Sequence, residues 1–300
     1  MSGWSKALIA SLDKRATVIS TKYGLVQVAK EGAGPQVLSI HGSPGGFDQG
    51  LLWAEHLQAG GCEIIAPSRP GYLRTPLDSG ESPAQQADLY AAMLDVLLIE
   101  KVTVLGISSG GPSAVHFAAR HPDRTVALLL DAAVLLPITP DNNWIERTIV
   151  ESNAGTWASC QIAKRWPKLS TALLVDALSS GLTRTSRKAA VDWITSHPAR
   201  LKSAAGLTSS LAPRKFRHSG HKNDEGNEIN LDPLPFADIK APSLISQGAN
   251  DAFPLIDHAV SALGQIVGAE FILVEEGHHG LPWCRRFAEV AERQIFLAHN

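Results

Sequence analysis

Short apolar runs alternate with helical patterns over the first part of the chain, and this alternation constrains the fold more than any other feature. Four runs of about five residues are rich in leucine or β-branched residues, at 36–40, 62–66, 102–106 and 126–130. Such runs suit strands that are buried on both faces of a parallel sheet. Amphipathic segments such as 83–100 separate them. The sequence therefore predicts an α/β sheet covered by helices.

Further strand patterns flank this series. Two β-type segments, 16–21 and 25–30, are joined by a short turn and predict an opening hairpin. Near the end of the chain, 242–248 and 270–276 again have strand character, and a helical pattern follows each of them. We therefore expect a mainly eight-stranded, mostly parallel sheet flanked by helices.

A helical stretch interrupts the sheet pattern after residue 137. It contains no buried-strand run, and it ends in a polar, turn-rich segment at 213–235 that is long for a loop without structure of its own. We expect residues 1–137 and 236–300 to form the α/β core. Residues 138–235 are expected to form a helical lid and its polar return segment.

Composition excludes some classes of partner. The 300 residues carry a net charge of −2 and are 44% hydrophobic, with no basic stripe for nucleic acid. The short basic run at 214–218 and the acidic residues of the return segment, such as Asp224, are expected to lie in solvent. A chain of this kind has enough apolar residues to bury a large core, as a monomer or a homodimer.

The three cysteines are widely spaced, which opposes a disulfide framework and gives no metal-ligand spacing. This usage favours a reducing, cytoplasmic location. Near the N-terminus the apolar stretch 7–10 is too short for a secretion signal or a membrane span.

The segment GISSGG carries the clearest chemical signal. It places Gly106-x-Ser108-x-Gly110 between a predicted strand and a predicted helix, which is the pattern of a nucleophile elbow. Gly106 and Gly110 lack side chains that would collide in the tight turn. The N–H of Ser109 lies at the start of the new helix, where an anion is favoured. The sequence predicts that Ser108 is a nucleophile.

A serine nucleophile needs a histidine base and an acid that orients it. In this architecture the acid and the histidine follow the serine in that order. Asp251 follows the strand pattern at 242–248, and the adjacent His278 and His279 follow the last one. Asp131, at the end of an earlier strand, is the alternative acid.

These motifs resemble those of the α/β-hydrolase fold superfamily over nearly the whole chain. HGSPGG (41–46) is similar to the HGxPG loop of the superfamily, and SRPGY (68–72) to its DRPGYG stretch, although Ser68 stands where aspartate is common. GISSGG, GANDAF and EEGHHG match its elbow, acid loop and histidine loop. The lid occupies the usual position of insertion.

The resemblance implies roles for individual residues. The backbone N–H groups of Ser43 and Ser109 would form the oxyanion hole, with His41 and Gly42 supporting the loop. The superfamily usually places its base directly after a glycine, which favours His278, and His279 would then line the substrate pocket.

The resulting expectation is a carboxylic ester or lactone hydrolase with no cofactor and no metal, acting on a small molecule. Trp144 and Trp157 of the lid are candidates for the substrate pocket. Alternatives within enzymes are a carbon–carbon bond hydrolase and a proline iminopeptidase-like enzyme. A small-ligand receptor on the same fold is the alternative outside enzymes.

Overall fold

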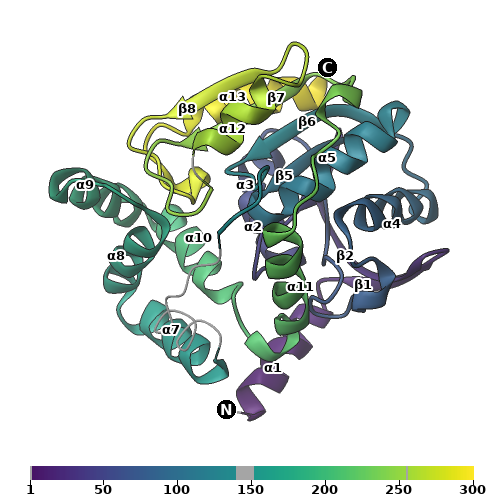
Figure 1. The fold of residues 1–300 in the computed structure, drawn as a ribbon. Coiled ribbons are helices and arrows are strands. Elements are labelled where there is room, and N and C mark those ends of the chain that lie inside the picture. Colours follow the sequence, from purple (N-terminus) through teal and green to yellow (C-terminus); the bar gives the residue numbers. More distant parts are fainter. Residues whose placement is uncertain (1, 140–151, 255) are drawn as a thin grey trace.

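A single eight-stranded sheet organises the computed structural model, which describes residues 2–139, 152–254 and 256–300 (Figure 1). The strand order is β1-β2-β4-β3-β5-β6-β7-β8, and all pairings are parallel except those that β2 makes with β1 and β4. The prediction of a mostly parallel sheet is confirmed. The strands are β1 (Thr17–Thr21), β2 (Gly24–Gly32), β3 (Gln36–Ile40), β4 (Glu63–Pro67), β5 (Val102–Ile107), β6 (Thr125–Asp131), β7 (Ser243–Gly248) and β8 (Glu270–Val274).

Helices cover both faces of the sheet. Neighbouring residues of one strand enter opposite layers, as Val37 and Leu38 of β3 do, because side chains alternate along a strand. This is why the central strands are apolar at nearly every position. One face holds α1 (Ser2–Asp13), α2 (Phe47–Trp53), α3 (Glu55–Ala59) and α13 (Ala288–His299), and the other holds α4 (Pro83–Val96), α5 (Gly111–Arg120) and α12 (Ile256–Leu263).

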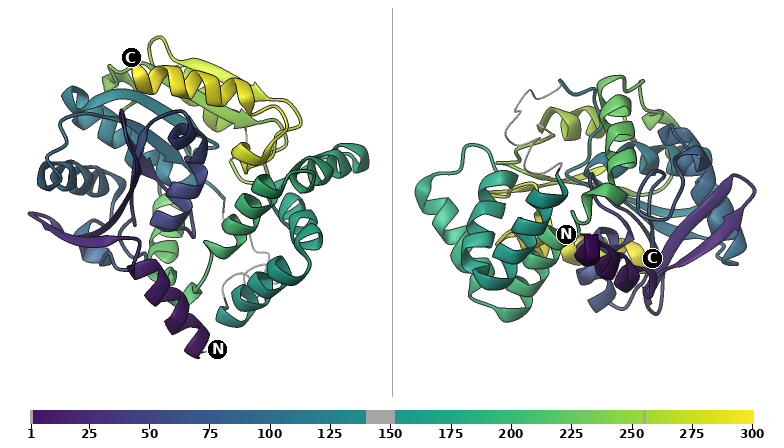
Figure 2. Two further views of the ribbon diagram at one scale, coloured as in Figure 1. Left: turned by 180° about the vertical axis from the view of Figure 1, so that it is seen from behind. Right: turned by 90° about the horizontal axis from the view of Figure 1, so that it is seen from below.

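Four of the described helices between β6 and β7, here called the insertion helices, pack on one another beside the sheet (Figures 1 and 2). Among them, α10 also contacts α2 and so joins the group to the core. Their division from the core at 137/138 and 235/236 stays a prediction. The insertion helices are α7 (Asn153–Arg165), α8 (Pro167–Leu178), α9 (Arg184–Thr195) and α10 (Pro198–Ser209).

Local departures from the predicted helices have simple causes. The pattern at 49–60 is divided at Ala54 into α2 and α3. The pattern at 281–298 begins as a short 3₁₀ turn that contains Pro282, and α13 starts only at Ala288. No helix in the described ranges is both long and apolar enough to cross a bilayer.

Candidate active site

Ser108 lies at the tip of a sharp turn between β5 and α5. Its φ of 49° is in the left-handed region, which residues with a side chain seldom adopt outside functional sites. A Cβ on Gly106 would lie 2.5 Å from Cβ of Ala114. Glycine at this position therefore lets α5 pack directly against β5 and hold Ser108 at the end of the strand.

The loop 41–46 after β3 passes directly beside Ser108. A Cβ on Gly42 would lie 2.9 Å from Cβ of Ser108, so only glycine fits there without movement. His41, the first residue of this loop, anchors it through both ring nitrogens. Its Nε2 accepts the N–H of Arg69 at 2.9 Å, and its Nδ1 donates to the carbonyl of Gly42 at 2.7 Å. Burial, reinforced by the charge of Arg69, lowers the pKa of His41 well below its ordinary value.

The two predicted oxyanion-hole residues belong to the two segments that meet at Ser108. Ser109 follows Ser108 within the turn, and Ser43 belongs to the loop that passes the nucleophile. Within the described ranges, the backbone N–H of Ser43 makes no hydrogen bond. The loop thus keeps a donor available beside the serine.

Asp251 is paired with the second histidine of the GHHG loop. Nδ1 of His279 lies 3.0 Å and 2.9 Å from the two carboxylate oxygens of Asp251. The carboxylate also accepts the N–H of Phe253 at 2.8 Å and the amide of Gln247 at 3.1 Å. These bonds hold Asp251 in an orientation that fixes the imidazole of His279.

The expectation that His278 pairs with Asp251 is therefore corrected. Its Nδ1 instead accepts the N–H of Gly280 at 3.1 Å, and within the described residues its buried side chain makes no hydrogen bond to that carboxylate. Burial, and then the neighbouring His279, lowers its pKa to about 4. Glu276, two residues before His278, has a φ of 55°.

Asp131, the alternative acid, is engaged elsewhere. Its two oxygens accept the indole N–H of Trp53 at 2.9 Å and the amide of Gln294 at 2.7 Å. Burial raises its pKa to about 6. Among the described residues, no hydrogen bond joins it to either histidine of the GHHG loop. The geometry therefore favours Asp251 as the acid.

Aromatic rings surround His279. Its imidazole centroid is 4.9 Å from that of Phe253 and 6.2 Å from that of Trp53, both edge-on. Sequence patterns did not single out either ring for the pocket. Of the two tryptophans that were singled out, Trp144 lies outside the described residues. Trp157 on α7 is 38% exposed, and no described ring contact brings it to this site.

A buried polar network behind the loop 41–46 was not predicted. Helix α11 (His218–Ile229) lies in the return segment, and its Asp224 accepts both ends of the Arg69 guanidinium at 2.7 Å and 2.6 Å. Tyr72 also donates to Asp224, and the Ser43 hydroxyl lies 2.9 Å from Tyr72 and 2.8 Å from Nδ1 of His221. The network connects α11 to the loop beside Ser108.

The prediction that the charged residues of the return segment lie in solvent is thus wrong for Asp224, Arg214 and Arg217. Asp224 is 4% exposed, while Arg214 and Arg217 are buried almost completely. Arg217 bonds the carboxylate of Asp48 at 2.8 Å and 3.0 Å and the carbonyl of Gly45 at 2.5 Å. Asp224 and Arg217 can be buried because each is paired with an opposite charge at short distance.

A parallel sheet of this order, with a serine at its sharp turn and an aspartate–histidine pair in later loops, defines a protein of α/β-hydrolase type. The chain belongs to the alpha/beta hydrolase fold family, which matches residues 35–283. Within the described ranges, no group of three or more histidine, cysteine or carboxylate side chains could hold a metal ion.

Known proteins with similar sequences agree with this assignment. An uncharacterized hydrolase of Bacillus subtilis, YcgS, is 29% identical over 95% of this chain and 98% of its own length. A 2-hydroxy-6-oxononadienedioate/2-hydroxy-6-oxononatrienedioate hydrolase of Pseudomonas putida is 27% identical over 88% of this chain and 87% of its own. A solved alpha/beta hydrolase fold protein from Nakamurella multipartita is 34% identical with a TM-score of 0.90, covering 95% and 99% of the two chains.

Proposed function

We propose that this protein is a serine hydrolase that cleaves a small to medium carboxylic ester or lactone, with Ser108, His279 and Asp251 as its catalytic triad. The observation that carries the proposal is the pairing of Asp251 with Nδ1 of His279. This bond places the histidine proton on Nδ1, so Nε2 keeps a lone pair for the proton of a serine hydroxyl.

The proposed reaction has two acyl-transfer steps. His279 takes the proton of Ser108 as the serine oxygen attacks the carbonyl carbon, and then gives it to the departing alcohol. Water, activated by the same histidine, releases the acid from the acyl-serine. Asp251 stabilises the charged imidazole in both steps.

The oxyanion of each tetrahedral intermediate is proposed to accept the N–H groups of Ser43 and Ser109. One such donor contributes roughly 3–4 kcal/mol to transition-state stability. The close approach of Gly42 to Ser108 supports this assignment, since it brings the loop to the nucleophile. Hydrogen bonds from Arg217 and His41 keep that loop in place.

We further propose that the segment 138–235 acts as a lid over this site and that the protein works in the cytoplasm. The insertion helices pack beside the sheet, and α10 contacts α2, which begins directly after the loop 41–46. The cytoplasmic location is supported by Cys62, Cys160 and Cys284, which are all free thiols.

The first test combines covalent labelling with turnover. A fluorophosphonate probe should label Ser108, and p-nitrophenyl esters of two to eight carbons should be hydrolysed. Ser108→Ala should abolish labelling and lower turnover by roughly a thousandfold or more. Folded protein that the probe does not label would overturn the proposed triad and favour a ligand receptor.

Carbon–carbon bond hydrolysis is the second candidate, because a relative that aligns over most of this chain is named a hydrolase of 2-hydroxy-6-oxononadienedioate, a ketoacid of the kind such an enzyme would cleave. The same triad would act on a vinylogous diketone acid. Labelling of Ser108 without ester turnover, together with cleavage of a 2-hydroxy-6-oxodienoate, would select this candidate over the ester hydrolase.

A further inference from the structure

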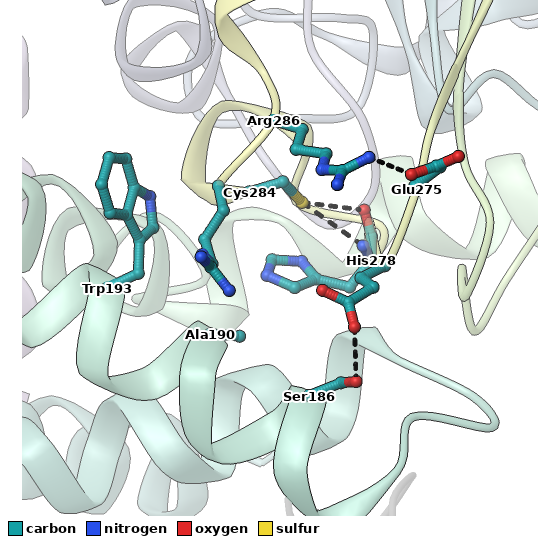
Figure 3. A pocket seen from close by; sticks show the side chains of 9 residues that line it. Ser186, Ala190, Trp193, Glu275, His278, Cys284 and Arg286 are labelled. Carbon is teal, nitrogen blue, oxygen red and sulfur yellow. Dashed lines mark hydrogen bonds and ion pairs between the residues drawn. The ribbon is translucent and has the colours of Figure 1, made fainter.

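A cavity of about 220 Å³ lies between helix α9 and the chain that follows β8 (Figure 3). None of the residues around it is Ser108, Asp251, His279 or Ser43. The cavity is therefore separate from the proposed triad and its oxyanion hole. Its lining comes from α9, which supplies Ser186 and Trp193, and from the segment after β8, which supplies Glu276, His278, Cys284 and Arg285.

His278 supplies an unused hydrogen-bond donor to this cavity. Its side chain is 1% exposed, and its Nε2 has no partner within the described part of the chain. Nδ1 accepts the N–H of Gly280 at 3.1 Å, so the single proton of the neutral ring is on Nε2. Figure 3 shows the His278 imidazole extending into the space bounded by Cys284 and Ala190. A buried N–H without an acceptor is costly, and a ligand oxygen would satisfy it.

One of the two arginines at the cavity is available for a ligand. Arg286 is paired with Glu275, whereas Arg285 has no hydrogen bond or ion pair to any described residue. The carboxylate of Glu276 already accepts the hydroxyl of Ser186 at 2.7 Å. The cavity thus offers one neutral donor and one free positive charge, with carboxylates at its exposed rim.

We propose that this cavity binds a small monocarboxylate, whose oxygens accept hydrogen bonds from Nε2 of His278 and the guanidinium of Arg285. A carboxylate suits this pair, since guanidinium–carboxylate bonds are strong and directional. Glu275 and Glu276 disfavour a second negative charge on the ligand. Trp193, Ala190 and Cys284 form an apolar wall for its carbon skeleton.

The proposal does not depend on the proposed function, because none of its residues belongs to the triad. The ligand used to test the proposal is benzoate, an aromatic monocarboxylate whose ring suits the apolar wall beside Trp193. Binding is expected in the millimolar range, as for a small ligand held by few hydrogen bonds.

The test follows histidine ring resonances by ¹H–¹⁵N long-range correlation while benzoate is added to the full-length protein. His278 is assigned by the resonance missing from His278→Gln, and it should show a neutral ring protonated on Nε2. Benzoate should shift this resonance with saturation. Arg285→Gln should weaken binding at least tenfold, which corresponds to about 1.4 kcal/mol.

Arg293→Gln is the matched control, since it removes the same charge from an arginine that is paired with Glu270 on the surface. It should change the benzoate affinity less than threefold. A His278 ring protonated on Nδ1, no saturable shift, or equal weakening in Arg285→Gln and Arg293→Gln would overturn the proposal. Each result is obtained whether or not the fluorophosphonate labels Ser108.

Discussion

At the scale of single residues, the two histidines of the GHHG loop have opposite environments. His279 bonds Asp251, while His278 is buried with its pKa lowered from 6.5 to about 4. Both follow Gly277 closely and have the same side chain, so no periodicity in the sequence separates them. The distinction lies in their long-range contacts, since His279 bonds Asp251 whereas Nδ1 of His278 accepts the N–H of Gly280. Ser108 was predicted from the elbow motif and Asp251 from the loop after a predicted strand, with Asp131 as the alternative acid; both assignments stay proposals.

The lowered pKa of His278 predicts a pH-dependent contribution to stability. Between pH 6.5 and pH 4 the unfolded chain binds a proton at this residue that the folded protein does not, so acid favours unfolding. The wild type should lose about 3 kcal/mol of unfolding free energy over this range relative to His278→Gln. Urea unfolding of both proteins at several pH values measures this difference. Parallel curves for the two proteins would contradict the assigned pKa.

At the scale of elements, the strands could be predicted and the role of the return segment could not. Strands were predictable because each one is a short apolar run with clear boundaries, as at β5. The burial of α11 depends on the ion pair between Arg69 and Asp224, which are 155 positions apart in the chain. The local sequence around Asp224 shows only a polar segment, and nothing in it indicates that Arg69 is the partner of Asp224.

The Arg69–Asp224 pair should therefore dominate the attachment of α11. Asp224→Asn leaves Arg69 buried without a counter-charge, which should cost roughly 3–5 kcal/mol of unfolding free energy. Chemical denaturation measures the loss. Glu31→Gln is the control, because it breaks an exposed pair with Arg15 that is worth at most about 1 kcal/mol. Similar losses in the two variants would show that the buried network does not hold the helix.

The Asp224→Asn substitution should also impair the proposed reaction. Asparagine keeps one acceptor oxygen where Asp224 has two for Arg69 and Tyr72, so the pair formed by Tyr72 and Ser43 would lose its fixed orientation. We expect a fall in kcat on p-nitrophenyl esters that exceeds any change in KM, because the proposed oxyanion hole would act mainly in the transition state. A variant that changes KM alone would place the network at the substrate pocket instead.

At the scale of the whole molecule, the sheet and the insertion helices differ in how deeply they are buried. All residues of β5 and β7 are buried, whereas α9 buries only Ala190 and Ile194. Local opening needs less free energy where fewer apolar contacts are broken. Hydrogen–deuterium exchange should therefore protect β5 and β7 most strongly and α9 far less. Uniform protection of the three elements would contradict this picture.

The most direct test of the proposed triad compares the two neighbouring histidines. The rate at which a fluorophosphonate labels Ser108 would be measured in the wild type, His279→Gln and His278→Gln. The pairing of His279 with Asp251 predicts a loss of roughly a hundredfold or more in His279→Gln, as for removal of a general base. His278→Gln should stay within about tenfold of the wild type, since Nδ1 of His278 bonds Gly280 and not the acid. A larger loss in His278→Gln than in His279→Gln would contradict the assignment of His279 as the base.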